Sequence, residues 1–286
     1  MHAKNSVIKK ILVPTDFSPK ADRALEIACE LARTTRCEIT ILHVLELPYS
    51  TELRKEKLRV ELEKAAKPAL KDAVKKAKSA VARLKVKVDH LMIVGNPIHA
   101  IVHEASKGKY DLICMGNRIT SGLRRLVFDN TTSGVIDLTP IPVLATTNKL
   151  PTVDLSRMMF GTDFRQGDLQ IINRISKLAA ELKSHLDVVH ISKRKTFDDE
   201  LRMAGFEAIS RKLNSYPQVD FHQFFNAEVD SGIERAVAEI KAGLIILSRE
   251  HRSVLDAIFG SNVIDDLVYK TEIPVLIFPI AQQPVV

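Results

Sequence analysis

Residues 11–17 of this chain, Ile-Leu-Val-Pro-Thr-Asp-Phe, recur 147 positions later as residues 158–164, Met-Met-Phe-Gly-Thr-Asp-Phe. Each copy is a short apolar run that ends in Thr-Asp-Phe, a pattern typical of a buried strand followed by a polar turn. Three more segments recur in the same order: 41–44 as 188–191, 111–116 as 243–248, and 140–144 as 272–276. The sequence therefore indicates two copies of one module in tandem.

The spacing between the copies sets the expected domain limits. The first two pairs of segments lie 147 residues apart and the last two lie 132 apart, so the second copy is 15 residues shorter between its second and fourth apolar runs. A chain of 286 residues suits two domains that each bury a core. We expect domains at residues 1–148 and 155–286, joined by a linker that contains Pro151.

Alternating periodicities predict the fold class. Short, fully apolar runs predict strands covered on both faces: 10–15, 38–44, 86–94, 111–115 and 142–146, then 157–162, 186–191, 218–225, 243–248 and 274–279. Amphipathic segments between them, such as 21–33 and 169–182, predict helices, and Ser18-Pro19 supplies a helix N-cap and first-turn proline. This alternation predicts an α/β protein with two tandem Rossmann-like domains, each a doubly wound parallel sheet.

The net charge of +7 is concentrated in one segment. Residues 52–87 hold 13 Lys or Arg and five Asp or Glu, a net charge of +8. This segment predicts a long helix, which we expect Pro68 to kink or to divide into two pieces. Most such charge runs are solvated helix faces, and no aromatic residue stands among these lysines to stack on a base, so nucleic acid is an unfavoured partner.

Cysteine usage and hydropathy indicate the compartment. Cys29 falls in an expected helix and Cys114 in an expected strand, and with Cys37 they form no Cys-x-x-Cys pair, which predicts buried, reduced thiols. The sequence contains no apolar run of the roughly 18 residues that a membrane-spanning helix needs. Residues 1–10 lack the apolar core of a signal peptide. We therefore expect a cytoplasmic protein without a membrane span.

The carboxyl ends of the strands are the expected binding edge of an open parallel sheet. An Asp there can accept a hydrogen bond from a ribose hydroxyl or a ring amine, and backbone N–H groups at a helix N-terminus can hold phosphate. The candidate binding residues are Thr15, Asp16, Val44, Gly116 and Asn130 in the first copy and Thr162, Asp163, Ile191, Ser248, Gly260, Ser261 and Asn262 in the second. The alternative for Asp16 and Asp163 is a structural role, in which they cap the following turn or helix.

These motifs, in this order and spacing, resemble the universal stress protein family. The resemblance rests on Pro-Thr-Asp-Phe-Ser (14–18), Leu-His-Val (42–44), Asp-Leu-Ile-Cys-Met-Gly (111–116) and Pro-Val-Leu (142–144), and it is stronger in the first copy than in the second. It implies for each copy a five-stranded parallel sheet of order 3-2-1-4-5, and pairing of the two domains through their last strands. A homodimer of four domains is a further expectation.

Nucleotide-binding members of that family carry Gly-x2-Gly-x9-Gly-Ser/Thr after the fourth strand, and both copies depart from it. At equal spacing the first copy has Gly116, Ile119, Asp129 and Asn130, and the second has Ser248, His251, Ser261 and Asn262, with Gly260-Ser261 one residue early. Ile119 in a left-handed conformation costs roughly 1–2 kcal/mol, and Asp129 places an anion where phosphate would bind. We expect no certain cofactor; ATP or another adenine nucleotide fits the second copy better than the first.

Enzyme and metal signatures are missing from the sequence. It has no Gly-x-Gly-x-x-Gly, Gly-x4-Gly-Lys-Ser/Thr or Gly-x-Ser-x-Gly motif and no evident pair of general acid and base. His99 and His103 lie four apart on an expected helix without a third ligand nearby, so we expect no metal site. His43 and His190, at equivalent positions, are interpreted as packed, hydrogen-bonded side chains, and we expect no catalytic residue.

Three hypotheses for the function follow. The first is a non-catalytic stress-response module that binds a partner or a small ligand and has degenerate nucleotide sites. The second is an adenine-nucleotide-dependent switch or slow ATPase that uses Thr162-Asp163 and Gly260-Ser261 of the second copy. The third is an adaptor whose basic helix at residues 52–87 docks on an acidic partner or nucleic acid.

Overall fold

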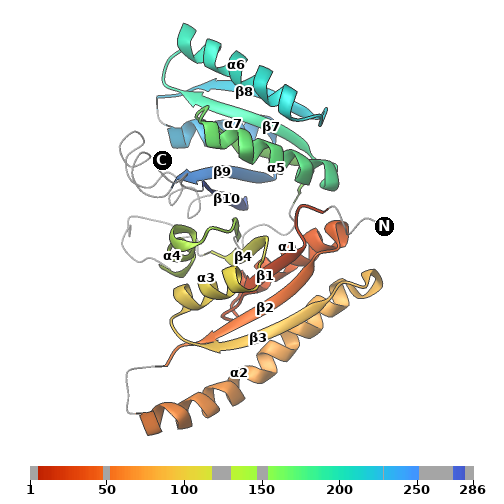
Figure 1. Cartoon of the computed structure of the whole chain (residues 1–286), viewed down its shortest axis with the longest axis vertical. Coiled ribbons are helices and arrows are strands. Elements are labelled where there is room, and N and C mark those ends of the chain that lie inside the picture. The colour runs from red at the N-terminus through yellow and green to blue at the C-terminus, as the bar shows by residue number, and fades with distance from the viewer. Residues whose placement is uncertain are drawn as a thin grey trace. The chain divides into compact units, whose positions relative to one another are not determined.

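A computed structural model of the chain describes residues 6–47, 52–117, 130–146, 154–227, 229–250 and 273–280. Contacts within the chain divide it into two compact units, Met1–Lys149 and Leu150–Val286. Strands and helices alternate along both units (Figure 1).

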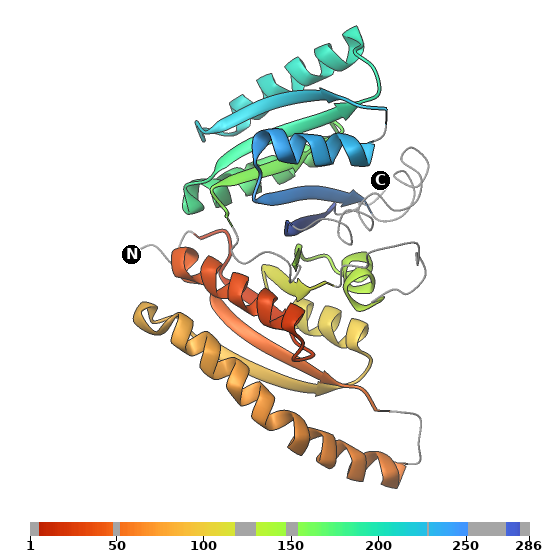
Figure 2. The same cartoon turned by 180° about the vertical axis from the view of Figure 1, so that it is seen from behind.

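The first unit is a five-stranded parallel sheet with helices on both faces. Its elements are β1 (Lys10–Pro14), α1 (Pro19–Thr35), β2 (Glu38–Leu45), α2 (Glu52–Ala80), a 3₁₀ turn η2 (Ala82–Leu84), β3 (Val88–Val94), α3 (Pro97–Lys107), β4 (Leu112–Gly116), α4 (Asn130–Leu138) and β5 (Val143–Thr146). The strands lie in the order β3-β2-β1-β4-β5. Helices α1 and α2 contact each other on one face of the sheet, and α3 and α4 contact each other on the opposite face (Figure 2).

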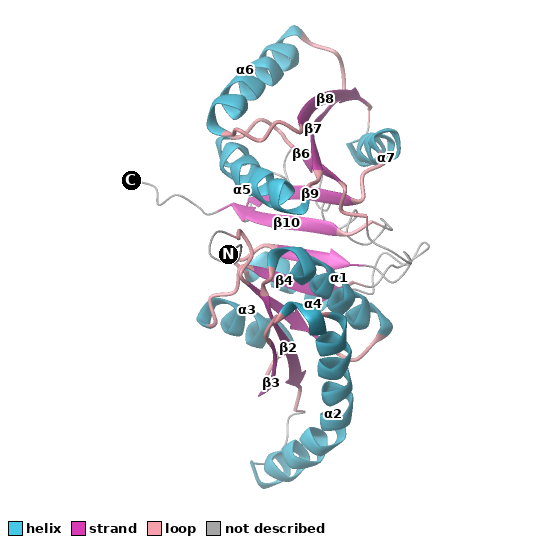
Figure 3. Cartoon of the chain, turned by 90° about the vertical axis from the view of Figure 1, so that its right-hand side faces the viewer, coloured by secondary structure: helices cyan, strands magenta, loops and turns pink. Residues whose placement is uncertain are grey.

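The second unit repeats this arrangement. Its elements are β6 (Arg157–Gly161), α5 (Gln166–Leu182), β7 (His185–Ser192), α6 (Phe197–Leu213), β8 (Val219–Phe225), α7 (Val229–Ile240), β9 (Leu244–Glu250) and β10 (Val275–Ile280), with strand order β8-β7-β6-β9-β10. Helices α5 and α6 lie on one side of strands β6 to β8 and α7 on the other (Figure 3). The predicted fold class and sheet order are confirmed, and every strand begins and ends within two residues of its expected bounds.

The central strands form the core of each unit. Residues 11–13 of β1 and residues 158–160 of β6 are all 0% exposed. A central parallel strand is covered by helices on both faces, so its residues are apolar without alternation. Full burial of each large apolar side chain stabilises the fold by about 1.5–3 kcal/mol, which explains why the repeated apolar motif predicts the sheet so well.

Helix α2 differs from the expectation at Pro68. The helix is continuous from Glu52 to Ala80, so the expectation of two helical pieces is wrong. Pro68 and Lys64 are both exposed, so water can hydrate the carbonyl that loses its donor, which lowers the cost of keeping proline in the helix. The buried residues of α2 within the described range 56–80 all lie in its second half: Leu70, Ala73, Val74 and Ala77.

The three cysteines are buried, as the sequence predicts. Cys29, Cys37 and Cys114 are buried and unbonded to one another. Burial raises the pKa of the Cys29 thiol to about 11, so this thiol stays protonated near neutral pH. No helix within the described residues has both the length and the apolar character that crossing a bilayer requires.

Candidate functional site

The Thr-Asp turn of the first unit lies where β1 ends. The N–H of Thr15 donates to the carbonyl of Leu42 at 2.8 Å, which extends the pairing of β1 with β2 by one residue. Phe17 has a φ of 61°, and its N–H donates to Oγ1 of Thr15 at 3.0 Å. Because a non-glycine residue at positive φ needs local support, the Thr15 hydroxyl helps to hold the turn that leads into α1.

The carboxylate of Asp16 is engaged at the start of α1. Its Oδ1 accepts hydrogen bonds from the N–H and the hydroxyl of Ser18 at 3.1 and 2.5 Å, and its Oδ2 lies 3.7 Å from Nζ of Lys20. Burial acts to raise the pKa of Asp16, but the hydrogen bonds from Ser18 and the charge of Lys20 outweigh it and lower the pKa below its ordinary value. Ser18 also caps α1, because its Oγ accepts from the N–H of Ala21 at 3.4 Å.

A histidine packs against the turn in each unit. Nδ1 of His43 lies 2.8 Å from the carbonyl oxygen of Thr15, and its ring centroid lies 4.3 Å from that of Phe17. A carbonyl can only accept, so Nδ1 carries the proton in this contact. The second unit repeats both contacts with His190, Thr162 and Phe164, at 2.8 and 4.2 Å. These contacts agree with packed, hydrogen-bonded histidines.

Gly116 ends β4 against the first turn of α1. A Cβ atom at this position would lie 2.3 Å from the carbonyl oxygen of Lys20 and 2.7 Å from the backbone nitrogen of Ala21. The φ of Gly116 is not positive, so left-handed geometry does not explain this glycine. Close packing of α1 on β4 does explain it.

The other candidates of the first unit extend the same edge. Val44 is half-buried on β2, where it pairs with Ile93, and Asn130 is the first residue of α4. Strand β1 lies between β2 and β4, so Thr15, Val44 and Gly116 come from the ends of three adjacent strands. Ile119 and Asp129 lie outside the described residues.

Thr132, in the first turn of α4, contacts the candidate residue Gly116 but was not among the sequence-based candidates. It is 2% exposed, and its hydroxyl donates to the carbonyl of Gly116 at 3.3 Å. The hydrogen bond ties the start of α4 to the end of β4. A signal was present in the sequence, because Thr-Thr-Ser directly follows Asn130 and hydroxyl residues favour helix starts.

Asp168 organises the corresponding turn of the second unit. Its Oδ2 accepts from the Thr162 hydroxyl at 2.8 Å and from the N–H groups of Asp163 and Arg165 at 3.2 and 3.3 Å. Its side chain is 0% exposed, and Oδ1 has no hydrogen-bond partner among the described residues. The repeat gave no signal for Asp168, because its counterpart in the first unit is Ala21. The remaining signal was an acid in the first turn of an expected helix.

Asp163 therefore has different surroundings from Asp16. At the start of α5, Asp168 accepts the hydrogen bonds that the N–H groups of Asp163 and Arg165 donate. Asp163 is 32% exposed, and its Oδ1 lies 3.9 Å from Nδ1 of His190. Ile191 and Ser248 are half-buried near the carboxyl ends of β7 and β9. The last three candidates lie outside the described residues: Gly260, Ser261 and Asn262.

Comparison with known proteins gives a consistent family. The universal stress protein family model matches residues 8–147. A universal stress protein of Methanocaldococcus jannaschii is 30% identical over 139 residues, which cover 49% of this chain and 82% of that protein. One of Bacillus subtilis is 29% identical over 149 residues, covering 48% of this chain and 98% of that protein.

A solved structure extends the likeness of fold to nearly the whole chain. The crystal structure of a universal stress protein from Archaeoglobus fulgidus covers 97% of this chain and 100% of its own, with a TM-score of 0.78 and 20% sequence identity. At that identity the match bears on the fold alone. Together with the Thr-Asp turn and the sheet order of the first unit, the sequence matches show that this chain belongs to the universal stress protein family.

Proposed function

We propose that this stress-response protein is a non-catalytic module that binds a partner or a small ligand and whose nucleotide sites are degenerate. The observation that carries the proposal is the bonding of Asp16. Its carboxylate, the group expected to accept from a ribose or a ring amine, is already held by Ser18 and Lys20 at the start of α1. These contacts support a structural role for Asp16, in which its carboxylate caps the turn before α1 instead of binding a ligand.

The other retained residues of the first unit support the same proposal. Thr15 holds the turn after β1, and Gly116 is required by the contact of β4 with α1. Both residues have structural roles that need no nucleotide. The sequence departures at Ile119 and Asp129 disfavour phosphate binding for the steric and electrostatic reasons given above.

We expect the purified chain to show no sustained ATP hydrolysis. Phosphate release with Mg²⁺ and ATP should stay at the level of a protein-free control, because the proposal gives the retained residues of the turns structural roles and no catalytic ones. Asp163→Ala and Asp198→Ala, a change at an exposed residue of α6, serve as site and control variants. Turnover that disappears in Asp163→Ala and persists in Asp198→Ala would contradict the proposal.

A nucleotide switch in the second unit is the second candidate function. It is favoured by one difference between the units: at the start of α5 the buried carboxylate of Asp168 accepts from the N–H groups of Asp163 and Arg165, whereas the side chain of Asp163 is 32% exposed. In this candidate, Gly260 and Ser261, which lie outside the described residues, would donate hydrogen bonds to the phosphates of an adenine nucleotide. This candidate predicts ATP binding that Asp163→Ala weakens.

For the assembly, we propose domains at residues 1–148 and 155–286 that pair within the chain through their last strands, and a homodimer of such chains. The contact boundary at Lys149 and Leu150 supports the domain limits. A solution mass of 32.0 kDa, the mass of one chain, would exclude the homodimer.

We propose a cytoplasmic location, which the three buried thiols support. We also propose an unidentified protein partner in preference to nucleic acid or a membrane.

A further inference from the structure

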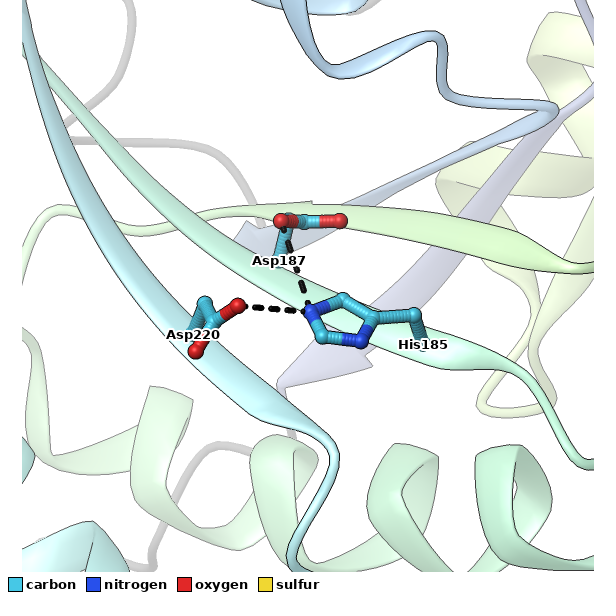
Figure 4. A group of neighbouring side chains, drawn as sticks. All are labelled: His185, Asp187 and Asp220. Atoms are coloured by element: carbon cyan, nitrogen blue, oxygen red, sulfur yellow. Dashed lines mark hydrogen bonds and ion pairs between the residues drawn. The ribbon is translucent and has the colours of Figure 1, made fainter.

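Histidine and aspartate side chains gather on one face of the second unit's sheet, near the amino ends of β7 and β8 (Figure 4). His185 and Asp187 are two apart on β7, so they share a face, and Asp187 pairs with Asp220 of β8. Nε2 of His185 lies 2.9 Å from Oδ2 of Asp220 and 3.8 Å from Oδ1 of Asp187. This cluster is at the opposite end of the strands from the Thr-Asp turn.

Asp187 is the fixed member of the cluster. It is 0% exposed, and the Arg157 guanidinium contacts Oδ2 at 2.9 and 3.1 Å and Oδ1 at 2.8 Å. Nε2 of His222 lies 2.8 Å from the same Oδ1. Two partners therefore set the orientation of this carboxylate, as outer partners do for metal ligands in many proteins. The side chains of His185 and Asp220 are 30% and 59% exposed, so an ion can reach the cluster from solvent.

We propose that His185, Asp187 and Asp220 bind a divalent transition-metal ion of the zinc type. One ligand atom from each residue lies within 4.8 Å of the other two. Zinc ligands at about 2.0–2.1 Å in tetrahedral geometry are about 3.3–3.4 Å apart, and the observed separations of 2.9 and 3.8 Å lie on either side of that value.

The donor set also fits the ion. One imidazole nitrogen and two carboxylate oxygens suit zinc, and water would complete the four ligands. The doubly charged ion offsets the two carboxylates. On Oδ1 of Asp187 it would replace the contacts with Arg157 and His222, while Arg157 keeps its contacts with Oδ2. Because Arg157 adds a positive charge next to the site, we expect micromolar affinity, weaker than that of a closed structural zinc site.

The first unit shows that the fold does not require this cluster. At the positions that correspond in register to His185, Asp187 and Asp220, it has Glu38, Thr40 and Asp89. Lys10 and Leu91 stand where the second unit has Arg157 and His222. The buried carboxylate and both histidines thus belong to the second unit alone. The first unit supplies a comparison within the same chain.

The test is calorimetric titration of the tag-free, chelator-treated 286-residue chain with Zn²⁺. We expect one saturable micromolar site, with affinity reduced at least about tenfold in His185→Gln and in Asp220→Asn. Both changes are at solvent-accessible side chains, and circular dichroism checks that the variants remain folded. The matched control is the double variant His99→Gln/His103→Gln, which removes an exposed pair of histidines four apart on α3.

The outcomes separate the proposal from its alternatives. Unchanged affinity in the control variant, with the losses named for His185→Gln and Asp220→Asn, supports the site. The proposal is overturned by the absence of saturable zinc binding, by unchanged affinity in His185→Gln and Asp220→Asn, or by loss of binding in the α3 control. None of these outcomes depends on nucleotide binding, so the proposal stands apart from the proposed function.

Discussion

Replacing Gly116 by alanine is expected to destabilise the first unit by about 2–3 kcal/mol. The added Cβ would lie 2.3 Å from the carbonyl oxygen of Lys20, inside the first turn of α1. A backbone atom within a helix cannot rotate away as a side chain can, so α1 has to shift from β4. Native-state hydrogen exchange followed by mass spectrometry measures this loss in the first unit separately, which suits a chain that has no tryptophan.

Gly205→Ala is the matched control for that change. A Cβ at Gly205 meets no atom within 4 Å, and the residue lies inside α6. Alanine is the better helix former, so this variant should be stabilised by up to about 1 kcal/mol. Equal exchange protection in Gly116→Ala and the wild type would mean that packing does not require the glycine. The remaining explanation for Gly116 would then be a role in ligand binding.

Replacing Asp168 by alanine is expected to destabilise the second unit by about 2–3 kcal/mol. The change removes the acceptor of three hydrogen bonds and leaves the N–H groups of Asp163 and Arg165 without that partner. This expected loss is smaller than the summed free energies of three hydrogen bonds to a charged acceptor. Burying the carboxylate costs free energy in the wild type, and the alanine variant no longer has that cost. Exchange protection at Asp163 and Arg165 is the measurement, because the loss should appear first in this turn.

Two further variants make the Asp168 prediction specific. Asp168→Asn keeps an acceptor oxygen and should lose less stability than Asp168→Ala. Asp22→Ala removes an acid from the first turn of α1 whose carboxylate is 41% exposed and lies 3.1 Å from Nζ of Lys76. A surface pair of that kind contributes about 0–1 kcal/mol. A loss in Asp22→Ala as large as in Asp168→Ala would contradict the importance of the buried carboxylate.

The fold was predictable because its signal is local and repeated. Residues 11–13 and 158–160 are apolar throughout because helices cover both faces of their strands. Comparison of the two copies removed the ambiguity of any single short run. The effect of Pro68 on α2 was predicted wrongly, because the helix is continuous through it. The exposure of the surrounding helix face decides how much stability a proline removes, and the sequence alone does not give that exposure.

In the turns after β1 and β6, the predictable residues were those that both copies share. Thr15 and Thr162 with their following aspartates were identified from the repeat, whereas Asp168 was missed because alanine stands at its counterpart. Asp187 and Asp220 were missed for a different reason. They come from two strands and meet only through the register of β7 with β8, and a single sequence does not specify register at this precision.

Whether either unit binds a nucleotide is decided by one measurement on the purified 286-residue chain. Mass spectrometry identifies the small molecules that denaturation releases, and calorimetric titration with ATP runs alongside. Degenerate sites predict no released adenine nucleotide and no saturable heat. Release of ATP, ADP or AMP, or micromolar binding that Asp163→Ala weakens, would contradict them and make the nucleotide switch of the second unit the leading function.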